Sequence, residues 1–217
     1  MCRLLFVQSK TEFLISDHLS IFASIAKNSK EYQGHGWGCS YLINNEWVNY
    51  KNINPIWEND FSQFPKTNRL IVHARSAFED KDIVVENNMP FFDDKYQFIF
   101  NGELRGVKIK AEGRIGAEKI FNFIKRFDTI NININNSLSK GIDILKKRTS
   151  YIRAMNIIIA EKNRVHYSSL FNEDATYFQM YYKQNKNELI ICSEKYPNEN
   201  NWESIENNSI GVFYDDY

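Results

Sequence analysis

Cysteine is scarce in this sequence: Cys2, Cys39 and Cys192 are the only three among 217 residues. Three widely spaced cysteines make neither a disulfide framework nor a zinc site with the usual ligand spacing. Unpaired cysteines are typical of a reducing compartment, so we expect a cytoplasmic protein.

The sequence also lacks a long apolar run and an excess of charge of one sign. No stretch approaches the roughly 20 apolar residues that span a bilayer, and the N-terminal segment lacks the length and the small-residue cleavage site of a signal peptide. Basic and acidic residues each number 27, so the formal net charge is +0. This balance argues against electrostatic capture of nucleic acid or of an anionic membrane surface.

Aromatic residues, in contrast, are plentiful. They make up 15% of the chain, with 16 Phe and 12 Tyr, and hydrophobic residues in total reach 43%. A chain of this length suits one large domain or two small ones and is long enough to bury a substantial core.

Hydrophobic periodicity and turn residues predict the order of secondary-structure elements. Strands are expected at 2–8, at 36–51 as a hairpin around Asn44-Asn45, at 67–76 and at 96–102, with four more in pairs over 154–171 and 176–194 and an edge strand at 211–217. Helices are expected at 17–28, capped by Ser16 or Asp17, at 55–64, at 116–127 and at 137–148, with a polar link at 131–136. Strands, then helices, then strands again favour an α+β layered fold over a βαβ repeat.

Cys2 directly follows the initiator methionine, which is normally removed when residue 2 is small. Removal would leave an α-amine and a thiol on one residue, with ordinary pKa values of about 7.7–8.0 and about 8.5. The amine can then take the thiol proton near neutral pH, so that one residue supplies both nucleophile and base. A cysteine at position 2 also occurs by chance in many proteins without this activity.

Six segments, in order along the chain, carry a resemblance to a known family. They are similar to the corresponding segments of class II glutamine amidotransferases, especially the small stand-alone branch: MCRLLF at the start, HGWGCSYL (35–42), HARSAF (73–78), NNMPFF (87–92), FIFNGEL (98–104) and CSEKYP (192–197). The resemblance implies an N-terminal nucleophile hydrolase, whose fold is a four-layer αββα sandwich, in a single domain over residues 1–217.

The resemblance also implies roles for individual residues. Cys2 matches the nucleophile, and Asn101 and Gly102 match the oxyanion hole that stabilises the charge formed on the amide oxygen; one such donor is typically worth about 2.7–4 kcal/mol. Arg75 matches the residue that holds a substrate carboxylate, which a guanidinium fork suits. From the residues alone, Asn-Gly favours a type I′ turn, and an arginine at a strand end is as readily a structural ion pair.

The pattern departs from the family around the substrate. The family's aspartate that binds the α-ammonium of glutamine corresponds here to Gly116, with the cation Arg114 two residues earlier. Phe78 replaces a threonine and Met89 a histidine, which makes the region more apolar. We predict Arg75, Phe78, Arg114 and Gly116 as substrate-binding positions.

Three explanations of Gly116 stay open. A shifted alignment would let Glu112 or Glu118 supply the missing charge. A substrate whose α-nitrogen is acylated, absent or otherwise uncharged would not need a carboxylate, whereas a half-buried ammonium without one is costly. Alternatively, the domain has lost its activity.

The sequence therefore predicts an amide hydrolase that cleaves glutamine or a γ-glutamyl-type amide through a thioester acyl-enzyme. The implied ligand is a small-molecule amide, and no metal, organic cofactor, nucleic acid or membrane is implied. Two alternatives remain: an inactive binding or regulatory domain of the same fold, and a glutaminase subunit that supplies ammonia to a separate synthase, because no synthase domain follows in the chain.

Overall fold

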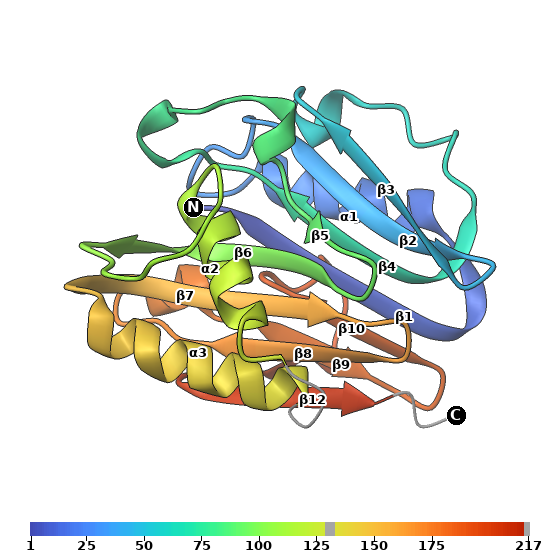
Figure 1. The fold of residues 1–217 in the computed structure, drawn as a ribbon. Helices are drawn as coiled ribbons and strands as arrows, with labels where there is room; N and C mark the ends of the chain where they lie inside the picture. Colours follow the sequence, from blue (N-terminus) through green and yellow to red (C-terminus); the bar gives the residue numbers. More distant parts are fainter. Residues whose placement is uncertain (129–132, 215–217) are drawn as a thin grey trace.

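Two antiparallel sheets form the centre of the computed structural model, which describes residues 1–128 and 133–214 (Figure 1). The first sheet has seven strands, in the order β11 (Glu203–Ser204), β9 (Tyr181–Gln184), β10 (Glu188–Cys192), β1 (Arg3–Leu14), β4 (Lys66–Ala74), β2 (Trp37–Ile43) and β3 (Glu46–Asn52). The second has five strands, in the order β12 (Ser209–Tyr214), β8 (Arg164–Ser169), β7 (Tyr151–Ala160), β6 (Gln97–Arg105) and β5 (Phe91–Phe92).

Helices cover the outer faces of these sheets. Figure 1 shows α1 (Ile15–Lys27) against the first sheet, and α2 (Gly116–Lys125) and α3 (Ile134–Arg148) against the second. A single helical turn, α4 (Ala175–Phe178), precedes β9, and three 3-10 turns lie in the connections: η1 (Ile56–Glu58), η2 (Phe78–Asp80) and η3 (Val85–Asn87). The predicted α+β, four-layer αββα architecture is confirmed.

The alternation of side chains along β1 explains how the layers are joined. Leu5 and Val7 pack with α1 in one apolar cluster, whereas Leu4 and Phe6 point the other way and pack with residues of the second sheet. Successive side chains of a strand lie on opposite faces, so the four consecutive apolar residues at positions 4–7, in β1, must be covered on both sides. β1 therefore belongs at the centre of the sandwich.

Most predicted elements are confirmed, with shifts at their ends. Asn44 and Asn45 both have positive φ and join β2 to β3, as a hairpin turn of two asparagines requires. The helix expected at 55–64 is wrong, because only the 3-10 turn η1 forms there. The cap of α1 is also wrong: Leu14 is the N-cap residue, without a side-chain hydrogen bond.

Two more boundaries differ from the prediction. The strand expected to begin at 176 begins at Tyr181, because the preceding residues form α4. The polar link expected at 131–136 is wrong from Ile134 onward, where α3 begins with Asn133 as its cap; residues 131–132 and 215–217 lie outside the described residues.

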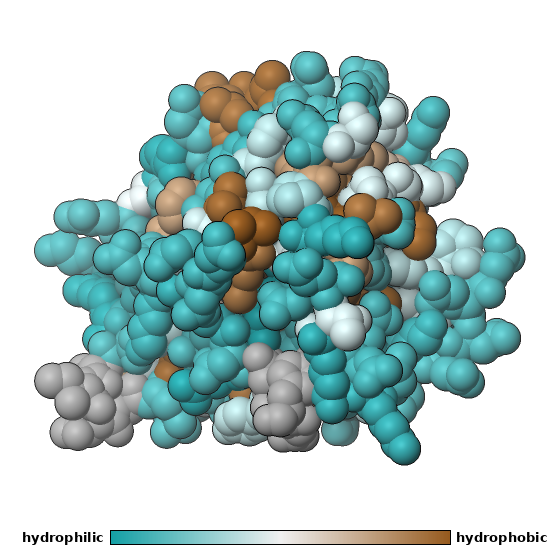
Figure 2. Space-filling model, turned by 90° about the vertical axis from the view of Figure 1, so that its right-hand side faces the viewer, coloured by the Kyte–Doolittle hydropathy of each residue, from teal (hydrophilic) through white to brown (hydrophobic). Residues whose placement is uncertain are grey.

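The surface agrees with the balanced composition. The face in Figure 2 is mostly hydrophilic, and its apolar side chains gather in the upper half rather than in a continuous band. In the described part of the chain, no helix combines the length and the apolar character needed to cross a membrane.

Acid pH should destabilise the fold through His73. Burial lowers the pKa of this side chain from 6.5 to about 3, so between these values the unfolded chain binds a proton that the folded chain does not. The free energy of unfolding therefore falls as pH decreases below 6.5, by on the order of 1 kcal/mol per pH unit from this one group. We expect His73→Gln, which does not titrate but keeps an N–H donor, to show a flatter loss of stability between pH 6.5 and 5 in urea titrations.

Other titrating groups contribute equally to the pH dependence of stability in the wild type and in His73→Gln, so their effects cancel when the two proteins are compared. His18, whose pKa burial lowers to about 4, titrates in the wild type and in the variant alike. Equal slopes of stability against pH for the two proteins would contradict the assignment to His73.

Candidate active site

The first residues of the chain lie beside the end of β4. The register pairs Arg3 with Ala74, which brings Cys2 next to the segment that follows β4. The Cys2 thiol donates a hydrogen bond to the carbonyl of Ser76 at 3.6 Å. Cys2 is buried, with 8% of its surface exposed.

A contact between the sheets brings β6 to the same place. The His73 Nε2 atom donates to the carbonyl of Phe100 at 3.2 Å, which joins β4 in the first sheet to β6 in the second. Asn101 and Gly102 follow directly in β6, opposite Asn156 and Met155 of β7. The turn that the Asn-Gly pair predicted is wrong, because both residues lie within a strand.

Asn101 is a buried amide without a hydrogen-bond partner. Its side chain is fully buried, and neither its Oδ1 nor its Nδ2 has a partner among residues 1–128 and 133–214. Buried polar groups normally have partners, and an orphaned one costs about 1–3 kcal/mol. An unsatisfied amide is expected where a side chain forms its hydrogen bonds only with a bound ligand.

Gly102 is required by the close approach of β7. A Cβ atom at this position would lie 2.2 Å from the carbonyl oxygen of Ala154 and 2.8 Å from the Phe100 ring. No side chain fits there, so the backbone of Gly102 stays accessible from the opposite side, where it lines a pocket together with Cys2.

This pocket has a volume of about 530 Å³. It brings together residues from the N-terminus, the segment after β4, β6 and the start of α2. Its walls are largely apolar, and four cations and two carboxylates lie among them: Arg75, Lys81, Arg114, Lys119, Asp82 and Glu103.

One terminal nitrogen of the Arg75 guanidinium group is hydrogen-bonded within the protein, and the other has no partner in the described residues. Its Nη2 atom donates to the carbonyl of Asp82 at 2.9 Å, whereas the buried Nη1 atom has no partner among the residues described. Burial lowers the pKa of Arg75, and the neighbouring charges of Cys2 and Asp82 oppose that shift. Among the cations of the pocket, Arg75 is the one with a buried guanidinium nitrogen that lacks a partner in the described residues.

The three other predicted binding residues also line the pocket, each in a different way. Phe78 is 51% exposed at its rim, with the Arg105 guanidinium 5.7 Å from the ring centre. Arg114 is bound to Glu118 through Nε–Oε2 at 3.0 Å and Nη2–Oε1 at 2.7 Å. Gly116 is the first residue of α2, and apart from its chain neighbours and the backbone of its own helix no described atom lies within 4 Å of a Cβ placed on it.

Met1 occupies a set of polar groups beside Cys2. Its ammonium group forms an ion pair with Glu31, and its carbonyl accepts hydrogen bonds from Gln33 and from the hydroxyl of Tyr177. These contacts come from residues far from Met1 in sequence, so no sequence motif predicts them. The carbonyl they bind belongs to the peptide bond between Met1 and Cys2, whose nitrogen becomes an α-amine when Met1 is removed.

The protonation of Cys2 depends on these surroundings. Burial raises the pKa of the thiol, and the nearby N-terminal ammonium and Arg75 partly oppose that increase. An ordinary buried thiol is a poor nucleophile because it stays protonated, so reactivity here requires a base or a closer positive charge.

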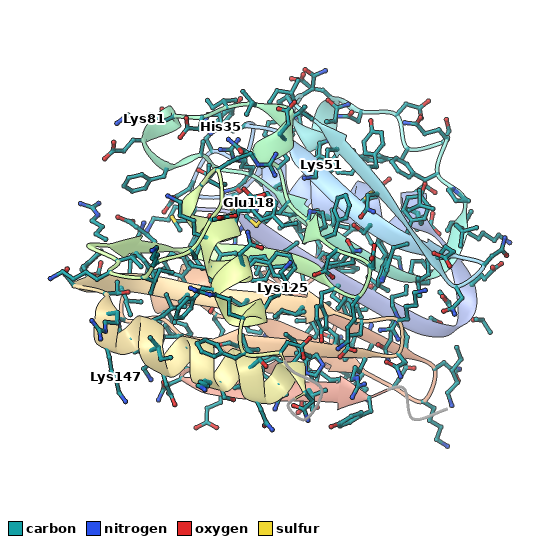
Figure 3. All side chains as sticks on the ribbon, viewed as in Figure 1. His35, Lys51, Lys81, Glu118, Lys125 and Lys147 are labelled. Atoms are coloured by element: carbon teal, nitrogen blue, oxygen red, sulfur yellow. The ribbon has the colours of Figure 1, made fainter. Side chains whose placement is uncertain are left out.

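Among the described residues around the thiol, neither of the two histidines acts as that base. His73 is held neutral by burial and donates to Phe100. His35 accepts a hydrogen bond from the Ala77 backbone N–H at 2.9 Å and so holds the loop after β4. His35 itself comes from the segment before β2, and Figure 3 shows it in the upper part of the view, above Glu118 on α2.

Comparison with solved structures identifies the fold. The chain superposes on a glutamine aminotransferase class-II domain protein from Silicibacter pomeroyi with a TM-score of 0.69 and 13% identity, over 98% of this chain and 95% of the other. A predicted glutamine amidotransferase from Pseudomonas aeruginosa gives 0.62 at 13% identity, over 99% and 98%. This chain has the class II glutamine amidotransferase fold.

A larger enzyme contains the same fold as a part. The glutamine phosphoribosylpyrophosphate amidotransferase from B. subtilis superposes with a TM-score of 0.62 at 13% identity, over 88% of this chain but only 42% of that chain. No protein-family profile and no curated protein matches the sequence. The amidotransferase fold is therefore recognisable from the structure at a sequence identity too low to define an activity.

Removal of Met1 should lower the pH at which Cys2 reacts. The structure places an amide nitrogen next to the thiol while Met1 is present, and burial keeps the pKa of the thiol high. A free ammonium on the same residue favours the thiolate by direct charge attraction, which we expect to lower the midpoint of iodoacetamide labelling by at least about one pH unit. Peptide mapping before and after enzymatic removal of Met1 measures this shift.

The other two thiols serve as internal controls. Burial raises the pKa values of Cys39 and Cys192 as well, and neither lines the pocket with Cys2. Their labelling should not depend on Met1. An unchanged midpoint for Cys2 would contradict the role assigned to its α-amine.

Proposed function

We propose that this protein is an amide hydrolase in which Cys2, made N-terminal by removal of Met1, is the nucleophile. The observation that carries the proposal is the buried, unpartnered amide of Asn101. Asn101 itself does not line the pocket, but it directly precedes Gly102, which lines the pocket together with Cys2. Oxyanion stabilisation needs fixed donors in a site from which water is excluded. A buried donor without a protein partner meets that need.

The reaction follows from the residues around the pocket. The α-amine of Cys2 takes the thiol proton, and the sulfur attacks the carbonyl carbon of the substrate amide. The Asn101 Nδ2–H and the Gly102 backbone N–H donate to the oxygen as it becomes negative. The C–N bond then breaks, the nitrogen leaves as ammonia or an amine with the proton from the α-ammonium, and an acyl thioester remains on Cys2.

Water completes the cycle. The α-amine accepts a proton from water as its oxygen attacks the thioester carbonyl, the C–S bond breaks, and the free acid leaves with the thiol restored. Arg75 holds a substrate carboxylate through its available Nη1 atom. A metal or organic cofactor has no part in this scheme.

The groups that hold Met1 support the same role for the mature N-terminus. Glu31 is a carboxylate next to the Met1 ammonium, and its own pKa is lowered by that ammonium and by Arg153, against the opposing effect of burial. When Met1 leaves, Glu31, Gln33 and the Tyr177 hydroxyl are free to face the Cys2 α-amine directly or through water.

One observation favours a second candidate function. Because Met1 is bound by three side chains from distant parts of the chain, a protein that keeps Met1 would have a blocked α-amine and would act as a binding or regulatory domain. The N-terminal residue of the protein isolated from its native source separates the two candidates. Transfer of the ammonia to a synthase partner and location in the cytoplasm stay predictions of the sequence.

Replacing Asn101 should separate catalysis from stability. The Asn101 amide has no partner to lose, so we expect Asn101→Ala to keep the melting temperature or raise it. The same change removes one oxyanion donor and should lower kcat by about 10²–10³-fold with little change in KM. Ammonia release from a panel of ω-amides by Met1-free protein measures kcat, and calorimetry measures stability.

Asn156 and the cysteines provide matched controls. Asn156 lies opposite Asn101 but donates to Phe178 at 2.7 Å and accepts from Leu170 at 3.1 Å, so Asn156→Ala should lose stability. Cys2→Ala should abolish ammonia release, whereas Cys39→Ala should retain it. Amide hydrolysis by Cys2→Ala at the wild-type rate would show that the proposed mechanism is wrong.

A further inference from the structure

The pocket wall around the start of α2 is open and apolar. Gly116 leaves free space where a side chain would stand, and the neighbouring wall consists of aliphatic side chains from β6, the following loop and α2: Leu104, Val107, Ile109, Ile115 and Ile120. At about 530 Å³, the pocket falls within the ~300–1,000 Å³ range of sites that enclose drug-sized ligands. It therefore has room for a ligand larger than one free amino acid.

The carboxylates near this wall are engaged or lie elsewhere. Glu103 forms ion pairs with Arg105 at 2.5 Å and with Arg153 at 3.5 Å. Glu118, in the first turn of α2, is bound by Arg114. Asp82 also lines the pocket, but it lies in the loop after β4, where its backbone carbonyl accepts a hydrogen bond from Arg75.

The charges that face the pocket are mainly positive. Arg75 and Lys119 line it without a carboxylate partner among residues 1–128 and 133–214, whereas Arg114 is paired with Glu118 and Lys81 with Glu79. The N-terminal end of α2 also points toward the pocket. The first backbone N–H groups of a helix lack intrahelical partners, and this end carries a partial positive charge. An ammonium group beside Gly116 would be repelled and would lose its hydration, whereas a neutral group would not.

The geometry points to a substrate class: ω-amides of the glutamine type whose α-nitrogen is acylated and therefore uncharged. In this arrangement, which rests on the proposed function, Arg75 holds the α-carboxylate and Cys2 attacks the side-chain amide. The acyl group lies in the open space beside Gly116, against the aliphatic wall.

A direct test compares three amides with the Met1-free protein: L-glutamine, N-acetyl-L-glutamine and glutaramate, which lacks the α-nitrogen. We expect kcat/KM for N-acetylglutamine to exceed that for glutamine by about tenfold or more, since one unfavourable charge contact of about 1.4 kcal/mol gives a factor of ten. Glutaramate should fall between them, because it avoids the charge but leaves the space unfilled.

Substitution of Gly116 tests the position itself. Gly116→Asp places a carboxylate in the free space, at a helix N-terminus where an acidic residue is favourable for the helix. We expect the ratio of kcat/KM for glutamine to that for N-acetylglutamine to rise about tenfold or more in this variant. Gly116→Asn fills the same space without the charge, so its ratio measures the effect of the lost space alone. We expect the ratio in Gly116→Asp to exceed the ratio in Gly116→Asn by about tenfold or more, and circular dichroism verifies that both variants fold.

The outcomes distinguish the two levels of the proposal. Hydrolysis of all three amides with glutamine preferred would overturn the substrate class and direct attention to Asp82 as the partner of the ammonium. An equal change of the ratio in Gly116→Asp and Gly116→Asn would also overturn it, because charge would then have no part. If none of a broad set of ω-amides is hydrolysed and Cys2 forms no acyl adduct, the proposed function itself fails.

Discussion

The double burial of β1 is the constraint on which the candidate site depends. One face of the strand packs on α1 and the other on the second sheet, so β1 cannot slide or tilt without exposing apolar surface on one side. Its first residues are thereby fixed beside the end of β4, and the hydrogen bond from His73 to Phe100 holds β6 at the same level. Cys2, Arg75 and Gly102 meet at one pocket because these three strands are fixed together.

Periodicity and turn chemistry predict much of this framework. The apolar run at the start of β1 and the paired asparagines at 44–45 give clear local signals for a strand and a hairpin, and the structure confirms both. The predictions for the start of α1 and for the segment at 55–64 are wrong, and in both places a buried isoleucine, Ile15 or Ile56, packs in the same core cluster. Such tertiary contacts outweigh local capping and helix signals. For the Asn-Gly pair, the sequence allows both a turn and a place in the site. The close approach of Ala154 to Gly102, which requires the glycine, is a contact between two strands and leaves no signal in the local sequence.

The pocket combines reactive groups with an unusual distribution of charge. In the proposed function, Cys2 and the unpartnered Asn101 amide beside the pocket cleave an amide, and Arg75 binds a carboxylate. The resemblance located these residues, but their burial, their missing partners and the groups around Met1 required the structure. The same is true of Gly116: the sequence gives only the absence of a carboxylate, whereas the structure shows open space with an apolar wall and cations around it.

The central claim is that Cys2 forms a covalent acyl intermediate, and rapid-quench intact mass spectrometry tests it most directly. Met1-free protein mixed with N-acetylglutamine and quenched in acid within milliseconds to seconds should carry one additional acyl group, mapped to the peptide that begins with Cys2 and released by hydroxylamine. The adduct should be absent from Cys2→Ala. Amide hydrolysis without any adduct on Cys2, or an adduct on Cys39 or Cys192 instead, would contradict the account.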